Sequence, residues 1–419
     1  MTHDVVTSIR AEGIRSIDRA SLGLQIARDD GDAPAHGVTV LIGENGSGKS
    51  TLIEVCQLLQ RLASPDAMTT IQSVHGGVAR MLRPDHLSLR LGVTIEGVGP
   101  RLDYDVAFSD AACIEERLVE RGDRDVVLLE RTGNSARYFD AERGADQSMF
   151  FLSQGRLVMN AVPDSKVLLS EFGVRPPNAG IARMRAALSA IEVHVGFEVL
   201  PMWVARATQR KSEARGSVPL AAADRLSLLG ANLPNAYHAL QNDFGLEHWA
   251  RTLDLVRLGL GDEIETVSTA VDPAGGAVAL RVKLSGSDRW LLASQLSDGM
   301  LAYLAVVAML RLNAGRTLLA IDEPELHLHP GLLVRVIRAI RAASFEAPVL
   351  VATHARRFLD ELDAPEQTAV LCARRAGDGA TRLLRADPDA LARWLAHYDG
   401  LGRMLDEGVE SLVMCREEA

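Results

Sequence analysis

Apolar residues follow two periods along this chain, one typical of buried strands and one typical of helices. Residues 38 to 42, VTVLI, form a continuous apolar run, as in a strand that is covered on both faces. From Ser50 onward the apolar residues recur at helical spacing, at Leu52, Ile53, Val55, Cys56, Leu58, Leu59 and Leu62. Residues 43 to 50 between them, GENGSGKS, are small or polar. The pattern predicts a strand, a glycine-rich loop and a helix in direct succession.

The period changes twice in the middle of the chain. Residues 87 to 160 consist of short alternating segments such as LSLRLGVTIE and DVVLLERT, divided by Gly, Asp and Asn, which predicts meandering antiparallel strands. Between about 163 and 250 the pattern is helical, with IARMRAALSAI and NAYHALQNDFGLEHWARTLDLVRLGL divided by the polar loop ATQRKSEARGSVP. We interpret this second stretch as a lateral helical lobe.

The C-terminal part alternates buried strands with helices. TLLAI, PVLVAT and QTAVLCA read as strands, and GLLVRVIRAIRAA as a helix between the first two, which favours a mostly parallel sheet covered by helices. We therefore expect an α/β fold in which residues 1–105 and 261–419 form one body. Residues 106–162 form a β-rich insert and residues 163–260 the helical lobe.

Composition and charge narrow the class of protein. The chain has 419 residues, of which 47% are hydrophobic, enough for a packed core. The net charge of -10 repels nucleic acid overall, so a DNA site would have to be a local patch. The best candidate is RATQRKSEAR, residues 206 to 215, although such a run is more often a solvated loop. Its basic residues are Arg206, Arg210, Lys211 and Arg215.

Cysteine usage and hydropathy indicate a cytoplasmic protein. Cys56, Cys113, Cys372 and Cys415 have no close pair spacing, and the N-terminus lacks an apolar signal core, which together favour free thiols in a reducing compartment. The longest apolar stretches, near residues 301 to 310 and 317 to 321, are much shorter than the roughly 20 residues of a membrane-spanning helix. We expect no membrane association.

The glycine-rich loop has the residue types that bind a triphosphate. Glycines allow close backbone approach, so that successive N–H groups face the phosphates, while Lys49 adds a positive charge and the Ser50 hydroxyl is placed to bind Mg²⁺. The following helix presents its positive dipole end to the same anion. The alternative is a chance match in a surface loop. The candidate nucleotide-binding residues are Gly43, Glu44, Asn45, Gly46, Ser47, Gly48, Lys49, Ser50 and Thr51.

Two more candidate residues sit at the end of the strand in TLLAIDEPELHLHP, residues 317 to 330. Ligands of open α/β sheets bind at the carboxyl ends of the strands, which places Asp322 and Glu323 beside the phosphate loop. Asp322 suits the Mg²⁺ shell, and Glu323 suits deprotonation of an attacking water. His354 follows the strand PVLVAT and reaches the same edge. The alternatives are an ordinary acidic turn and a structural histidine.

LASQLSDGMLAYLAVVAML, residues 292 to 310, begins a helix at Ser297. Ser297 is typical of an N-cap, and the apolar face behind it fits a core helix. A serine and a glycine at an exposed helix N-terminus also form an anion site. Taken alone, the segment fits a capped core helix better than an anion site.

Together these segments resemble a known family. GENGSGKS, LSDGM, IDEPE and the TH of VATHARRF, in this order, resemble the phosphate loop, signature, Walker B and switch-histidine motifs of an ABC-type ATPase head. The wording DEPELHLHP and LSDG, with the opening SIRAEGIRSI, resembles the SMC, RecF and OLD branch. The chain is most similar to stand-alone bacterial AAA-family ATPases of the AAA_21 type, related to the ATPase half of OLD nucleases. The resemblance implies a P-loop NTPase fold in which residues 1–105 and 261–419 are the two parts of the head.

The resemblance also implies a mechanism. Two heads dimerise on ATP, and Ser297, Asp298 and Gly299 of one copy close on the γ-phosphate that the other copy holds. Glu323 is then the catalytic carboxylate and His354 the switch. Residues 327 to 330, HLHP, occupy the place of the D-loop that crosses the dimer interface. A zinc site at His327 and His329 is the minor alternative, because no third ligand is evident.

Several departures from the family pattern limit this transfer. Asp298 places a negative charge where the partner's triphosphate should bind. Gln72, in TTIQSVHGG, is the best candidate for the Q-loop and for a further Mg²⁺ ligand, and an ordinary polar loop residue is an equal alternative. Only 65 residues follow His354, too few for the nuclease domain of OLD proteins. Without a coiled-coil arm the chain does not fit an SMC protein.

The leading hypothesis is a Mg²⁺-dependent ATPase whose ATP-bound state is a homodimer. It would act in DNA maintenance or in anti-phage or toxin-type defence, on DNA or through a separate effector such as a nuclease or toxin. One alternative is a signalling scaffold that binds ATP and barely hydrolyses it. The other is the ATP-binding subunit of an ABC transporter, which the long inserts and the LSDG and DEPELHLHP wording disfavour.

Overall fold

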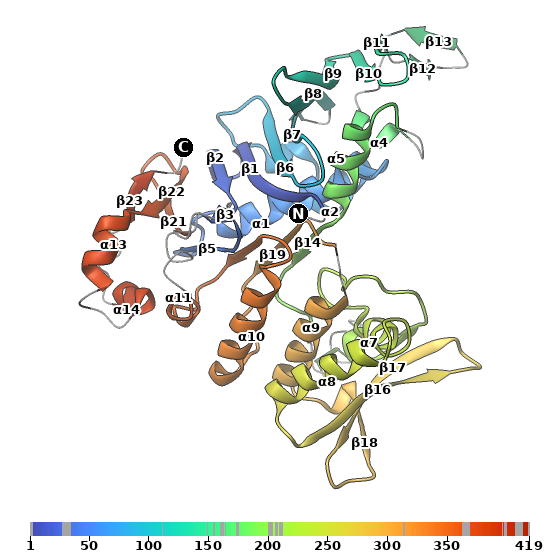
Figure 1. Ribbon diagram of the computed structural model, residues 1–419, viewed down its shortest axis with the longest axis vertical. Coiled ribbons are helices and arrows are strands. Elements are labelled where there is room, and N and C mark those ends of the chain that lie inside the picture. The colour runs from blue at the N-terminus through green and yellow to red at the C-terminus, as the bar shows by residue number, and fades with distance from the viewer. Residues whose placement is uncertain are drawn as a thin grey trace.

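The chain folds into a central sheet flanked by a second sheet on one side and a lobe on the other (Figure 1). The computed structural model describes residues 3–26, 35–110, 112–148, 150–153, 156–159, 163, 165–172, 176–199, 204–205, 208, 213–312, 315–362, 369–395, 397, 400–406 and 414–417. No helix within these ranges is long and apolar enough to cross a membrane.

The central sheet has seven strands in the order β14-β19-β20-β5-β21-β22-β23. The first five are parallel, and β22 and β23 are added antiparallel at one edge. The strands are β14 (Ile191–His194), β19 (Leu318–Asp322), β20 (Val349–Ala352), β5 (Val38–Gly43), β21 (Val370–Arg375), β22 (Thr381–Ala386) and β23 (Met414–Glu417). Because the parallel strands are covered on both faces, their apolar runs are continuous rather than alternating.

Successive residues of the central strands enter two separate cores. Leu318 and Ala320 face helix α1 (Lys49–Arg61), together with apolar residues of the second sheet. Leu319 and Ile321 face helices α9 (Asp298–Leu312) and α10 (Pro330–Ala343). The central sheet therefore separates the phosphate-loop helix from the lobe.

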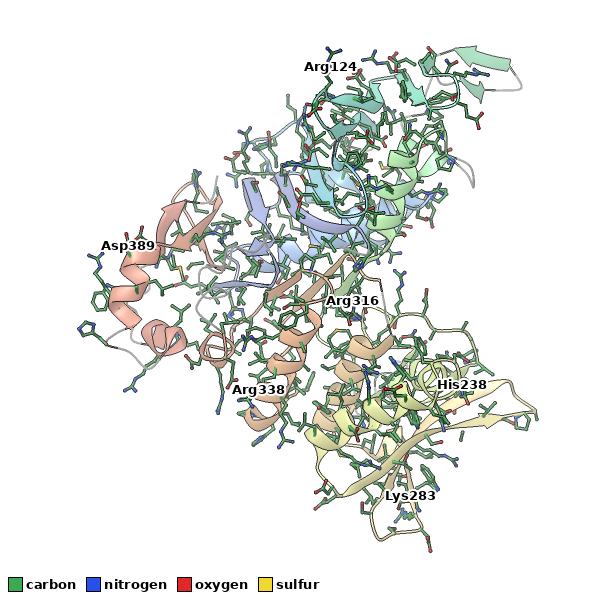
Figure 2. All side chains as sticks on the ribbon, in the orientation of Figure 1. Arg124, His238, Lys283, Arg316, Arg338 and Asp389 are labelled. Atoms are coloured by element: carbon green, nitrogen blue, oxygen red, sulfur yellow. The ribbon has the colours of Figure 1, made fainter. Side chains whose placement is uncertain are left out.

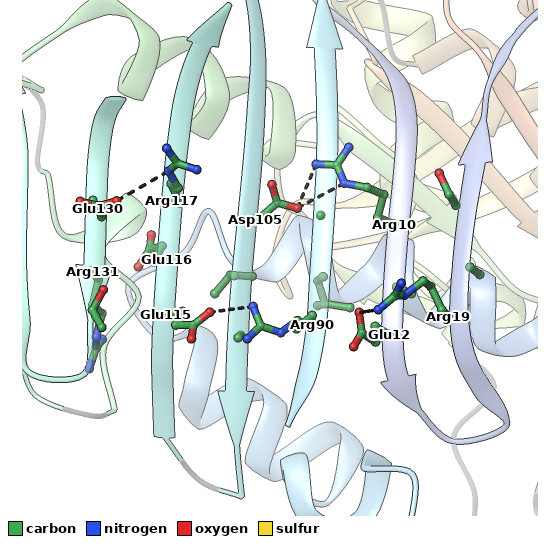
Figure 3. A pocket seen from close by; sticks show the side chains of 18 residues that line it. Arg10, Glu12, Arg19, Arg90, Asp105, Glu115, Glu116, Arg117, Glu130 and Arg131 are labelled. Atoms are coloured by element: carbon green, nitrogen blue, oxygen red, sulfur yellow. Dashed lines mark hydrogen bonds and ion pairs between the residues drawn. The ribbon is translucent and has the colours of Figure 1, made fainter. Parts of the chain in front are cut away.

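The second sheet is antiparallel, with eight strands in the order β11-β10-β9-β8-β7-β6-β1-β2. Its strands are β1 (Val5–Ile14), β2 (Ile17–Gly23), β6 (Leu89–Glu96), β7 (Arg101–Ser109), β8 (Ala112–Arg121), β9 (Val126–Thr132), β10 (Ser135–Asp140) and β11 (Ala145–Ser148). One face packs on α1. The other carries charge pairs across the strands, including Arg10–Asp105 and Arg90–Glu115 (Figure 3). These charges neutralise one another, as on a solvated face.

The lobe contains helices and a further sheet. The helices α7 (Leu233–Asn242) and α8 (Leu246–Leu260) pack with α9 on an antiparallel sheet of β15 (Ser217–Pro219), β17 (Ala277–Leu284) and β16 (Ile264–Asp272), to which β18 (Trp290–Leu292) is paired. Arg316, labelled in Figure 2, lies where the lobe joins the central sheet and is buried. Its Nε lies 3.5 Å from Glu192, and its Nη2 donates to the Met309 carbonyl oxygen.

These elements cross the predicted domain boundaries. The range predicted as a helical lobe, residues 163–260, also contains strands: β14 belongs to the central sheet and β15 pairs with β17. Helix α9 and strands β16 to β18, from the predicted range 261–419, belong to the lobe. The boundary between residues 105 and 106 falls inside β7. Pairing between distant segments decides to which sheet each of these strands belongs, and a local sequence pattern does not show such pairing.

The remaining described elements are short. They are β3 (Gln25–Ile26), β4 (Ala35–His36), α2 (Ala67–His75), α3 (Val78–Met81), β12 (Phe150–Ser153), β13 (Arg156–Met159), α4 (Leu168–Glu171), α5 (Ala179–Ser189), η1 (Glu213–Arg215), η2 (Ala293–Gln295), α11 (Arg357–Asp360), α13 (Pro388–Leu395) and α14 (Leu401–Asp406).

Candidate nucleotide-binding site

The glycine-rich loop joins β5 to α1 with a backbone that only glycine adopts easily. Gly43, Gly46 and Gly48 have φ values of 143°, 76° and 103°. An added Cβ would collide with the Ala373 carbonyl oxygen at Gly43 and with the Thr381 hydroxyl at Gly48. The loop can therefore turn its N–H groups toward an anion at the start of α1 only with glycine at these positions.

Lys49, the first residue of α1, folds back over the loop. Its side-chain Nζ donates to the carbonyl oxygens of Gly43 and Glu44 at 2.8 and 3.0 Å. Burial lowers the pKa of Lys49, and the nearby carboxylates of Asp322 and Glu323 oppose that shift. The ammonium group is thus held at the mouth of the loop, where a triphosphate would replace its carbonyl partners.

Thr381, at the start of β22, holds the loop from its outer side. Its hydroxyl lies 2.8 Å from the Ser16 hydroxyl and donates to the Ser47 carbonyl oxygen at 2.9 Å. Its backbone N–H donates to the Ser16 carbonyl oxygen at 2.7 Å. Thr381 is buried. Sequence reasoning missed this residue, because no local signal links a hairpin threonine to a loop more than 300 positions away.

Asp322, the last residue of β19, accepts a hydrogen bond from the Ser50 hydroxyl. Burial raises the pKa of Asp322, while this hydrogen bond and the charge of Lys49 act in the opposite direction. Its Oδ1 is buried and has no hydrogen-bond partner among the described residues. A hydroxyl and a carboxylate are hard oxygen donors of the kind that hold Mg²⁺ together with phosphate oxygens and water. The residues present therefore fit Mg²⁺.

Glu323 and His354 face each other at the carboxyl edge. His354 Nε2 lies 3.6 Å from Glu323 Oε1, and each side chain is a little over a third exposed. Glu323 has a φ of 51°, a left-handed conformation that is costly for a residue with a Cβ and that turns the chain sharply after β19. This geometry leaves a carboxylate and an imidazole open to solvent at the edge where a water and a γ-phosphate would meet.

Glu325 fixes the segment that carries His354. Its Oε1 accepts hydrogen bonds from the Thr353 hydroxyl at 2.8 Å and from the backbone N–H groups of His354 and Ala355 at 2.8 and 3.1 Å. This one carboxylate therefore ties the turn after β19 to the turn after β20. Sequence reasoning assigned Glu325 no role. The signal was present in the acidic DEPE wording, but its partners could not be read from it.

A cavity of about 650 Å³ opens in front of the loop. Its walls include the loop residues Gly43 to Asn45 and His354, and three arginines that the sequence analysis did not single out. These are Arg356 after β20 and Arg374 and Arg375 at the end of β21. Basic side chains around a phosphate loop favour an anionic ligand.

The predicted signature residues lie at the tip of α9. Ser297 is exposed, and its hydroxyl accepts a hydrogen bond from the backbone N–H of Met300 at 3.2 Å. Asp298 forms an ion pair with Arg215. Gly299 lies against the D-loop-like segment, since an added Cβ would be 3.0 Å from the His327 carbonyl oxygen. Signature and D-loop-like residues are therefore neighbours within one copy.

Of the four basic residues in the candidate run, only Arg215 lies within the described residues. Arg215 is buried and hydrogen-bonded to the protein, so it does not contribute to a basic surface patch. Arg206, Arg210 and Lys211 lie outside the described residues. Sequence reasoning read Arg215 as part of a solvated run because charge composition alone does not show which member of the run turns inward.

His327 and His329 lie between β19 and α10. Both are exposed, and His327 has a φ of 64°. His329 is the N-cap of α10, where its Nδ1 accepts from the Gly331 N–H at 3.2 Å. No group of three or more His, Cys, Asp or Glu residues that could hold a metal occurs in the described ranges. The zinc alternative therefore gains no support from the structure.

Gln72 lies on helix α2 rather than in the expected polar loop. It is exposed, and its side-chain oxygen lies close to Gly77. Within the part of the chain that is described, no hydrogen bond joins Gln72 to Ser50 or Asp322. Its role as a Mg²⁺ ligand stays a prediction. Of the four cysteines, Cys56, Cys113 and Cys372 are buried, and the side chain of Cys415 lies outside the described residues.

One segment of the chain matches a known protein family. Residues 261–360 match the family described as "AAA domain, putative AbiEii toxin, Type IV TA system". This segment is therefore assigned to an AAA_21 domain. The matched segment contains the predicted signature, Walker B and switch-histidine positions. The pairing of β20 with β5 places the phosphate loop at the same sheet edge. The match over residues 261–360 agrees with the predicted family, and the strand order confirms the predicted α/β fold with a mostly parallel sheet and a separate antiparallel sheet.

More distant similarities exist to solved structures, whereas no curated protein matches. An Smc head bound to the C-winged helix domain of ScpA is 13% identical, with 93% of this chain and 99% of that chain covered and a TM-score of 0.47. The SMC head domain from Thermotoga maritima is 13% identical, with 91% and 99% covered and a TM-score of 0.42. An Smc head with an extended coiled coil, bound to the C-terminal domain of ScpA derived from Pyrococcus furiosus, is 12% identical, with 94% and 99% covered and a TM-score of 0.45.

Proposed function

We propose that this AAA_21 protein is a Mg²⁺-dependent ATPase whose ATP-bound state is a homodimer. One observation carries the proposal: the carboxyl edge of a single parallel sheet brings together the phosphate loop, Asp322, Glu323 and His354. At the same time Ser297 is exposed at the tip of a long helix and is available to a second copy.

Each residue at the edge has a chemical role in this proposal. Lys49 and the N–H groups of the loop hold the β- and γ-phosphates. Ser50 and Asp322 would hold Mg²⁺, which neutralises phosphate charge when bound. Glu323 orients an attacking water and takes up its proton, and His354 stabilises the charge that develops at the γ-phosphate. The second copy's Ser297 and Gly299 N–H close the site from the other side.

We propose that nucleotide state controls a partner. The family description names a putative toxin of a toxin–antitoxin system, which supports an effector or toxin-type defence role, on DNA or through a separate protein. Hydrolysis then times the opening of the dimer. The alternative, an ATP-binding scaffold with little turnover, shares every binding residue and differs in the use of Glu323.

Trapping the closed state tests the dimer. The Glu323→Gln variant keeps the shape of the side chain but removes the base, so it should form a stable dimer with Mg²⁺ and ATP and remain monomeric without nucleotide. Multi-angle light scattering of both samples gives the mass. Glu142→Gln, at an exposed acidic residue on the turn after β10, is the matched control and should behave as wild type. Monomers of Glu323→Gln with and without ATP would refute the dimer model.

Turnover separates the two functions. Phosphate release by the wild-type protein alone, abolished in Glu323→Gln, supports the ATPase. ATP binding without measurable release in either protein supports the scaffold instead. Affinity capture with ATP-bound Glu323→Gln, followed by identification of bound protein and nucleic acid, then tests the effector and DNA arms.

A further inference from the structure

Asp298 places a carboxylate at the N-terminus of α9, beside Ser297. In the proposed dimer this tip approaches the triphosphate held by the other copy. An unpaired carboxylate there would repel the γ-phosphate and cancel part of the attraction of the helix dipole. A glycine-like residue would avoid this problem, so the acidic residue needs a physical explanation.

Arg215 supplies the opposite charge from below the surface. Its side chain is 2% exposed, whereas that of Asp298 is 43% exposed, so the ion pair runs from the interior to the tip of α9. Arg215 Nη2 donates to Asp298 Oδ1. Burial lowers the pKa of Arg215 and the charge of Asp298 opposes this, yet a guanidinium remains charged at any physiological pH.

The other hydrogen bonds of Arg215 fix the backbone that leads into α9. Its Nη1 donates to the carbonyl oxygens of Leu296 and Ala293 at 2.6 and 3.3 Å. Its Nε donates to the Val199 carbonyl oxygen at 3.1 Å. One buried cation therefore satisfies three backbone carbonyls and also neutralises Asp298, which sets both the direction and the net charge of the tip.

We propose that Arg215 is a positioning residue for the trans site: it compensates Asp298, so that the tip of α9 stays attractive to the partner copy's γ-phosphate. This inference rests on the proposed function. With the pair intact, the tip presents the Ser297 hydroxyl and the helix N-terminus, and the Arg215–Asp298 pair has no net charge. Asp298 then holds Arg215 in place through the ion pair and does not weaken anion binding.

The proposal predicts opposite effects from the two halves of the pair. Arg215→Met leaves the Asp298 carboxylate without its ion-pair partner and should raise the ATP concentration for half-maximal dimerisation about 10-fold. Asp298→Asn leaves the Arg215 guanidinium without its ion-pair partner and should lower that concentration several-fold, because the tip gains a net positive charge. The double variant should return close to the starting value. A purely structural role predicts weaker dimerisation in both single variants and no restoration in the double variant.

The experiment uses the Glu323→Gln background, in which hydrolysis does not deplete the closed state. Light scattering across an ATP titration gives the half-maximal concentration, and thermal melting reports the fold of each variant. The matched controls are Arg183→Met and Asp4→Asn, which break another partly buried pair, of 18% and 12% exposed side chains, between helix α5 and the residue before β1. They should lower the melting temperature without shifting the ATP response.

The outcomes are separable. If Glu323→Gln does not dimerise with ATP, the proposed function fails. If it dimerises but Asp298→Asn shifts the ATP response in the same direction as Arg215→Met, or not at all, the role of Arg215 is refuted and the ATPase dimer stands. Should Arg215→Met fail to fold, Asp298→Asn alone decides, since its side chain is partly exposed and its predicted effect is tighter dimerisation.

Discussion

The carboxylate of Glu325 accepts a hydrogen bond from the backbone N–H of His354 at 2.8 Å. The two residues follow different strands of the central sheet, and the same oxygen also accepts from the hydroxyl of Thr353, which is buried. Glu323 lies two positions before Glu325 and faces the His354 ring. The proposed base and the proposed switch are therefore fixed to each other through one carboxylate, and displacement of either strand end moves both.

Removal of this carboxylate should slow catalysis more than binding. We expect Glu325→Ala to lower kcat for ATP hydrolysis by about 10- to 100-fold, because a small displacement of catalytic groups has effects of this size. The phosphate loop is untouched, so KM for ATP should change little. Glu325→Gln retains an acceptor oxygen and should fall between wild type and Glu325→Ala. Steady-state phosphate release measures both constants, with Glu142→Ala as the control. Equal kcat values for wild type and Glu325→Ala would contradict the role of Glu325.

Asp322 should carry the Mg²⁺ dependence of nucleotide binding. Asp322→Asn keeps the size of the side chain and removes its charge, so Mg²⁺ should no longer strengthen ATP binding, a loss of at least about 10-fold in the affinity for Mg²⁺–ATP. Calorimetric titration with Mg²⁺ and with a chelator separates this effect from binding of metal-free ATP, which should be unchanged or tighter. Asp389→Asn, at an exposed residue of α13, is the control. A similar Mg²⁺ response in Asp322→Asn and wild type would exclude Asp322 as a ligand.

The parts of the site that the sequence predicts are those built from consecutive residues. The loop, its helix and the acidic strand end each obey a local rule, since glycine spacing, apolar periodicity and a carboxyl-edge position are visible in one segment. The cap at Ser297 is local in the same sense. Parallel strands then bring these segments together in a way that fold class alone implies.

The parts that the sequence does not predict depend on contacts between distant segments. Thr381 contacts Ser47 across 334 positions of sequence and Arg215 contacts Asp298 across 83, and neither residue type has a preference that signals such a contact. The strands β14 and β15, within the predicted helical lobe, depend on distant pairing in the same way. Strand β14 has only four residues and follows helix α5, so only its pairing with β19 shows that it belongs to the central sheet.

The Thr381 hydroxyl should stabilise the phosphate loop. Thr381→Val preserves the shape of the side chain but loses the hydrogen bonds to Ser16 and Ser47, which should cost about 1–3 kcal/mol of unfolding free energy because buried partners are left unsatisfied. Loosening of the loop should also weaken ATP binding. Urea denaturation and nucleotide titration measure the two effects. Thr132→Val, at an exposed residue of β9, should leave both unchanged, and the prediction fails if Thr381→Val behaves like it.

Glu54 on α1 should make stability depend on acid. Arg15, in the turn between β1 and β2, donates to both Glu54 carboxylate oxygens at 2.6 and 2.8 Å, and His75 Nδ1 lies 2.7 Å from Oε1. Burial alone would raise the pKa of Glu54, but the hydrogen bonds from His75 and Arg15 outweigh it and lower the pKa from 4.5 to about 2. This cluster ties the turn that contains Ser16 to the helix behind the phosphate loop.

A carboxyl group whose pKa is lower in the folded protein than in the unfolded chain stabilises the fold when it is deprotonated. The contribution of Glu54 should therefore be complete above the ordinary pKa of 4.5 and should disappear as the pH falls toward about 2. We expect Glu54→Gln to lower the unfolding free energy at neutral pH by about 2 kcal/mol and to show a shallower loss of stability between these pH values. Urea midpoints across this range measure the slope, with Glu142→Gln as the exposed control. Parallel slopes for wild type and Glu54→Gln would show that the Arg15–Glu54–His75 cluster does not hold the turn through the charge of Glu54.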